Sequence, residues 1–160
     1  LSFRISSMSA GAAQATFWAY AALNGVAFTT IFLAFTGTSI ARVFFIAAAT
    51  FAAMSLYGYT TKKDLSGWGT FLFAGLIGIV VAGLVNIFLA SSALQFAISV
   101  IGVVVFVGLT AYDTQRIKEV YYEGDGHEIA AKKSIMGALT LYLDFINIFI
   151  MMLQLFGDRK

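Results

Sequence analysis

Two aspartates stand out because each interrupts or ends a long apolar run. Asp144 lies between LTLYL (139–143) and FINIF (145–149), and Asp113 follows residues 65–112, which carry no charge. A charged side chain in a membrane span is costly, so it usually faces the bundle interior and has a function. If the two carboxyl groups meet, they cannot both ionise cheaply, so they could share one proton near neutral pH and lose it as the pH rises. The deprotonated pair would offer hard oxygen ligands of the kind that calcium prefers.

Several polar residues are predicted to lie on the same face of the helix as Asp144. At about 100° per residue, five side chains fall in one narrow sector: Thr140, Asp144, Asn147, Met151 and Gln154. We therefore predict that Thr140, Asn147 and Gln154 line a pore. Two structural alternatives remain open. Asp144 could be a protonated donor between helices, and Asp113 could pair with Arg116 three residues along its own helix.

The elements that hold these residues are predicted to be membrane-spanning helices. Of the 160 residues, 60% are hydrophobic and 11% are charged, and mean hydropathy is +0.88. A soluble domain needs about 25% charged residues. The chain has neither cysteine nor proline, so disulfides, thiolate metal sites and proline kinks are excluded. A net charge of +2 gives no reason to expect nucleic-acid binding.

One transmembrane domain over residues 1–160 accounts for the apolar runs. A crossing takes roughly 20 apolar residues. Five spans fit, at about 12–35, 43–59, 68–89, 94–112 and 134–156, with turns at 36–39 and 90–93 and a charged loop at 116–133. The runs are continuously apolar, whereas barrel strands alternate. Four spans and one re-entrant segment are the alternative.

Depth and orientation follow from the charges. At about 1.5 Å per residue from Lys133, Asp144 lies some 16 Å deep, several ångströms deeper than Asp113, so contact requires a shifted last helix or a funnel. Seven Lys and Arg residues fall on one side and three on the other. The excess marks the cytoplasmic side. The loops 62–64 and 116–133 are therefore predicted to be cytoplasmic.

Small residues could allow the spans to pack closely, because lipid-embedded helices associate through close backbone approach. The candidates are Gly75, Gly78, Gly83, Gly102 and Gly108.

Three segments resemble the transmembrane Bax inhibitor motif family. Residues 108–118 (GLTAYDTQRIK) are similar to its sixth span, residues 137–149 (GALTLYLDFINIF) to its seventh, and residues 58–66 (GYTTKKDLS) to the bacterial segment between its fourth and fifth spans. The resemblance implies an all-α polytopic bundle of seven spans around a central last helix. The five spans here would be its third to seventh, with two N-terminal spans absent.

The resemblance also implies a pH-sensitive calcium leak channel of the bacterial inner membrane, acting in the lipid bilayer on calcium and protons without a cofactor. Asp113 and Asp144 would be the pH sensor and gate, and they could also bind calcium. Arg4 is the nearest candidate for an arginine that latches Asp113. The main alternative is a non-transporting regulator of a protease or stress response, acting through contacts with other membrane proteins. An intramembrane aspartyl protease fits less well, because Leu141-Tyr142-Leu143 precedes Asp144 where Gly-x-Gly is needed, and a Pro-Ala-Leu motif is absent. A non-enzymatic role is expected.

Overall fold

A computed structural model describes residues 7–120, 124 and 126–159, and within them the protein is helical with no strand. The helices are α1 (Ala10–Ala27), α2 (Thr29–Ala34), α3 (Gly37–Thr60), α4 (Ser66–Leu89), α5 (Ser92–Val120) and α6 (His127–Phe156). Five helical segments are long and apolar enough to cross a membrane, with α1 and α2 together forming the first. The predicted all-α polytopic membrane protein is confirmed.

The first two spans differ in detail from their predicted form. The first is interrupted at Phe28, where α1 ends and α2 begins. The predicted turn at 36–39 is wrong for three of its four residues, because α3 already begins at Gly37. Thr36 caps this helix by accepting a hydrogen bond from Ser39 N at 3.3 Å. A threonine oxygen that satisfies a free N–H of the first turn allows the helix to start there.

The charged segment 116–133, predicted as a loop, is mostly helical. The helix α5 continues to Val120, and α6 begins at His127. Hydropathy marks where the apolar part of a span ends, but Lys, Glu and Ala are good helix formers and continue the helices beyond it. Lys133 Nζ donates to Val120 O at 3.0 Å and ties these two extensions together.

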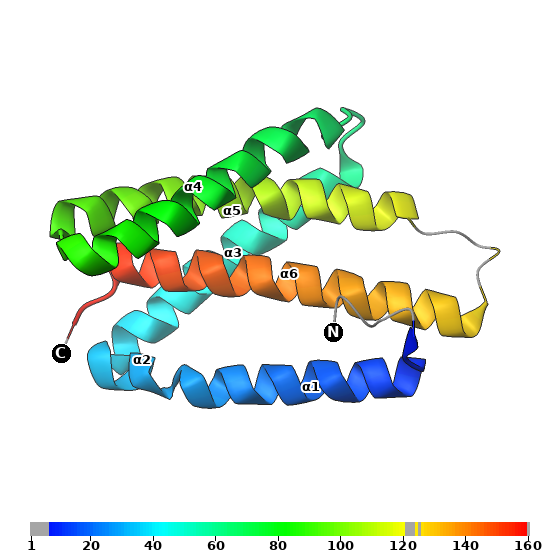
Figure 1. The fold of residues 1–160 in the computed structure, drawn as a ribbon, viewed down its shortest axis with the longest axis horizontal. Coiled ribbons are helices and arrows are strands. Elements are labelled where there is room, and N and C mark those ends of the chain that lie inside the picture. The colour runs from blue at the N-terminus through cyan, green and yellow to red at the C-terminus, as the bar shows by residue number, and fades with distance from the viewer. Residues whose placement is uncertain (1–6, 121–123, 125, 160) are drawn as a thin grey trace.

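The helices α5 and α6 run side by side in the middle of the molecule (Figure 1). The helix α3 packs against both of them, α4 packs against α5, and α1 packs against α6. Within the described part of the chain, α5 therefore shares the central position with α6. The outer helices turn large apolar side chains outward: Phe88 of α4 is 89% exposed, as expected for a surface that lipid covers.

Glycines set the closest helix contacts. A Cβ at Gly58 of α3 would collide with the backbone oxygen of Ala111 in α5, and one at Gly102 would collide with Met151 Sδ. Of the predicted glycines, Gly75, Gly102 and Gly108 do have close neighbours, whereas Gly78 and Gly83 have no atom within 4 Å of the Cβ position. Gly78 and Gly83 lie where no side chain of another described helix approaches α4.

Candidate functional site

Asp144 lies on the buried side of α6 and is only 5% exposed. Its polar neighbours on α6 do not donate hydrogen bonds to the Asp144 carboxylate. Thr140 Oγ1 donates to Met136 O at 3.0 Å, and Asn147 Nδ2 donates to Leu143 O at 2.8 Å. Among the described residues no donor reaches Asp144 Oδ2, which is fully buried. A buried carboxylate oxygen without a hydrogen-bond partner destabilises the folded state in an apolar bundle.

Asp113 is half-buried on α5, the helix that faces Asp144. Three contacts fix the axial register of this antiparallel pair. Ile117 lies against Gly137, Met151 lies against Gly102, and Val120 bonds to Lys133. In this register Asp113 is level with about Thr140, so Asp144 lies roughly one turn deeper, about 5 Å along the axis.

The two carboxyl groups nevertheless reach each other. The carboxyl groups of Asp113 and Asp144 lie close enough to interact with each other. Carboxylate oxygens only accept hydrogen bonds, so a hydrogen bond between them requires a proton on one of the two groups. We call Asp113 and Asp144 the aspartate pair. With one proton the pair is a hydrogen-bonded bridge between α5 and α6, and without it two negative charges face each other in a largely buried site.

The aspartate pair faces a groove of about 850 Å³ between α4, α5 and α6, which we call the central groove. Its lining is apolar apart from a few polar side chains. Asn147 and Met151 lie along one wall, and Ile79 and Phe73 of α4 form the other. Polar groups in an otherwise apolar groove are the usual signature of a binding or passage site.

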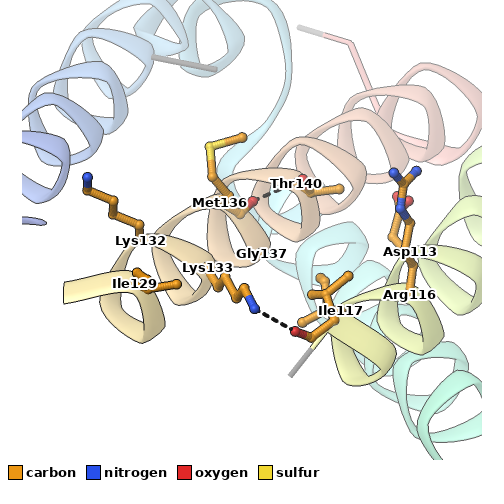
Figure 2. Close-up of a pocket in the computed structure, with 10 residues that line it drawn as sticks. Asp113, Arg116, Ile117, Ile129, Lys132, Lys133, Met136, Gly137 and Thr140 are labelled. Carbon is orange, nitrogen blue, oxygen red and sulfur yellow. Dashed lines mark hydrogen bonds between the residues drawn. The ribbon is translucent and has the colours of Figure 1, made fainter. Parts of the chain in front are cut away.

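A second cavity of about 680 Å³, the basic cavity, begins where the central groove ends. Asp113, Arg116 and Thr140 line both cavities. The basic cavity also receives Lys132 and Lys133 from α6 (Figure 2). Arg116 interacts electrostatically with Asp113, and Figure 2 shows the two side chains next to each other. Asp113 thus lies where the central groove meets the basic cavity.

Sequence comparison agrees with this arrangement. Residues 1–160 match the family described as inhibitor of apoptosis-promoting Bax1. The chain belongs to this Bax inhibitor family. It is 54% identical to the inner membrane protein YbhL of Escherichia coli over 100% of the chain and 69% of that protein. It is 54% identical to the protein RP147 of Rickettsia prowazekii over 92% of the chain and 63% of that protein.

A membrane protein of Streptococcus pyogenes is 46% identical over 91% of the chain and 63% of its own length. The chain of this Bax inhibitor family protein thus spans about two thirds of the length of these curated relatives.

The predicted site residues of this Bax inhibitor family protein are only partly brought together. Asp113, Thr140, Asp144 and Asn147 line the central groove, so the structure places these four at one site. Gln154 does not line it and instead accepts hydrogen bonds from α5. Arg4, the candidate latch, lies outside the described residues. The roles of gate, calcium ligand and pore lining stay predictions.

Sequence reasoning missed Gln115, which is 9% exposed. Its Oε1 accepts from Leu65 N at 2.8 Å, and its Nε2 donates to Lys63 O at 2.7 Å. It therefore fastens the α3–α4 loop to α5 two residues from Asp113. The only sequence feature that could have indicated Gln115 is its place between the apolar run of the span and the basic residues that follow. That feature does not identify a hydrogen-bond partner 50 residues away.

Proposed function

We propose that this Bax inhibitor family protein is a calcium leak pathway of the bacterial inner membrane, gated by protonation of the aspartate pair. The supporting observation is that the carboxyl groups of Asp113 and Asp144 lie close enough to interact and that both line the central groove. The inner-membrane location follows the name of the Escherichia coli relative.

The proton would control both the helix contact and the ion affinity of the site. The singly protonated pair bridges α5 and α6 and carries less charge, which favours a closed state. Loss of that proton leaves two carboxylates that repel each other and attract a cation. Repulsion at this point would push α5 and α6 apart next to the central groove.

The ligand set suits a passing calcium ion better than a resident one. Calcium takes six to eight oxygens, and the pair supplies at most four. Within the described residues no group of three or more His, Cys, Asp or Glu side chains could hold a metal ion. Thr140 and Asn147, which line the groove beside the pair, could add a hydroxyl and an amide oxygen. Water would complete the shell, so binding would be weak enough for release.

The distribution of lysine and arginine indicates on which side of the membrane the aspartate pair would lie. Lys62, Lys63, Arg116, Lys118, Lys132 and Lys133 belong to the predicted cytoplasmic side. The aspartate pair would then lie towards the cytoplasmic end. The positive charges of the basic cavity there would raise the energy barrier to cation entry. Ionised Asp113 would lower this barrier, because its negative charge balances the guanidinium of Arg116.

The test is calcium flux into proteoliposomes from about pH 5 to 8, comparing the wild type with Asp113→Asn and Asp144→Asn. Asp158→Asn is the matched control, since Asp158 is an exposed aspartate at the other end of α6. We expect a flux that rises with pH and that both pair substitutions flatten. Calcium accumulation against its gradient would indicate proton-coupled transport instead. No flux above empty liposomes from folded protein would refute the channel and favour the regulatory alternative.

A further inference from the structure

Three helix ends come together beyond the central groove, on the side away from Asp113. In Figure 1 the C-terminal ends of α4 and α6 come together with the start of α5, whereas α4 diverges from α6 towards its own N-terminus. A turn of only two residues, Ala90 and Ser91, joins α4 to α5 at this point. The lining of the central groove ends before this convergence, at Met151 on α6 and at Ile79 and Val80 on α4.

Side-chain hydrogen bonds hold this convergence together. Gln154 Oε1 of α6 accepts from Gln95 Nε2 at 2.7 Å and from Ser99 Oγ at 2.9 Å, both on α5. Gln95 Oε1 in turn accepts from Asn86 Nδ2 of α4 at 3.4 Å. Ser99 is 1% exposed. We call Gln95, Ser99 and Gln154 the amide lock.

Met151 lies between the central groove and the amide lock. It lies three residues before Gln154, about one turn nearer the aspartate pair, and it lines the end of the central groove. Its Sδ occupies the space that a Cβ at residue 102 would take, so Gly102 provides the notch into which Met151 packs. Along α6 the groove lining runs from Asp144 past Asn147 to Met151. Gln154 of the amide lock follows about one turn beyond Met151, about 15 Å from Asp144 along the helix.

We propose that the amide lock is a second closure on the ion path, in series with the aspartate pair and on its opposite side. This proposal rests on the proposed leak function. The lock has no ionisable group, so its opening does not change over the pH range in which the aspartate pair titrates. Opening requires α6 to separate from α5 at Gln154, an exposed residue, which frees amide and hydroxyl oxygens from their hydrogen bonds. These are ligands that a partly dehydrated calcium ion accepts.

The geometry favours a closure over ordinary packing. Interhelical hydrogen bonds between neutral side chains in membranes are individually weak, so two of them can open by thermal motion. Thr50, Thr110 and Thr140 bond within their own helices and leave no such connection. In the described part of α6, Gln154 is where polar side chains of both central helices bond directly to each other at the end of the groove.

The absence of cysteine from the sequence allows a test that does not depend on calcium. Asn147→Cys places one thiol in the central groove, between the aspartate pair and the lock. A membrane-impermeant charged thiol reagent is added to one face at a time, in spheroplasts and in inverted vesicles. We expect slow reaction from the face of the α4–α5 turn. Adding Gln154→Leu should speed that reaction roughly tenfold, because two interhelical bonds are lost.

Ser99→Ala, which removes one bond, should give a smaller increase and serves if Gln154→Leu does not fold. Thr50→Val is the control and should change nothing, because Thr50 bonds within α3. In flux assays Gln154→Leu should raise the leak at every pH and keep its pH dependence. Equal reactivity of residue 147 from both faces in the parent, or unchanged reactivity in the folded lock variants, would overturn the lock. If the lock variants change the thiol reactivity of residue 147 as expected but no calcium flux is found, the leak function is refuted and the lock is not.

Discussion

The carboxyl groups of Asp113 and Asp144 interact although the two residues lie about one helical turn apart along antiparallel helices. The contact is therefore diagonal, and it depends on the axial register of α5 against α6 as well as on their separation. A small slide of either helix would break it. Charge on the pair and helix position are thus coupled, which is the property that a gate requires.

The first prediction concerns the coupling between the two aspartates. Asp113→Asn and Asp144→Asn should each change the free energy of unfolding, but the double variant should differ from the sum of the two by about 0.5–3 kcal/mol. The reason is that the first substitution already removes the shared proton and the charge repulsion. Thermal or denaturant unfolding in detergent measures this. Asp113→Asn combined with Asp158→Asn should be additive, and additivity for the pair itself would contradict the contact.

The aspartate pair could be recognised from sequence, but its geometry could not. Asp144 stands out because it is a charge inside an apolar run, and the resemblance to the family joined it to Asp113. Counting residues correctly placed Asp144 deeper. What counting could not give is the register, since it is set by how Ile117 fits against Gly137 and Met151 against Gly102. Such side-chain fits leave no trace in hydropathy.

The helix ends and close contacts show the same limit. Spans were recognisable from apolar length, yet α5 and α6 continue past the apolar runs because charged helix formers extend them. Gly78 and Gly58 look equivalent in sequence. One faces open space and the other a backbone oxygen, because contact depends on which face the neighbouring helix covers.

The second prediction uses this difference between glycines. Gly58→Ala should lower the free energy of unfolding by about 1–3 kcal/mol, the usual cost of overpacking. The added Cβ would collide with Ala111 O, two residues from Asp113, and would force α3 away from α5. Gly78→Ala is the matched control and should be neutral or slightly stabilising, because nothing lies within 4 Å and alanine favours helix. Equal effects at both positions would show that α3 and α5 are not so close.

The third prediction concerns Gln115. Gln115→Leu leaves Leu65 N and Lys63 O without their partner, and the unsatisfied N–H of the buried Leu65 costs about 1–3 kcal/mol. We expect a lower unfolding temperature and faster tryptic cleavage after Lys62 and Lys63, because the α3–α4 loop is released. Thr114→Val, which removes a bond within α5, should leave loop cleavage unchanged. Cleavage at the wild-type rate in Gln115→Leu would mean that this clamp does not hold the loop.

The last prediction gives a pH dependence outside the membrane. Hydrogen bonds from the backbone N–H and the hydroxyl of Ser66 lower the pKa of Asp64 below its usual 3.8. A lowered pKa in the folded state means that the ionised carboxylate stabilises the start of α4 above about pH 4, and that this contribution is lost as the pH falls through the folded-state pKa. Asp64→Ala should therefore lower the unfolding temperature at pH 7, with the difference from wild type shrinking towards pH 3. Asp64→Asn keeps an oxygen that can accept from Ser66 N but cannot ionise, so its own contribution should not change with pH. A difference between Asp64→Ala and wild type that stays constant from pH 7 to pH 3 would mean that the charge of Asp64 contributes nothing to the helix start.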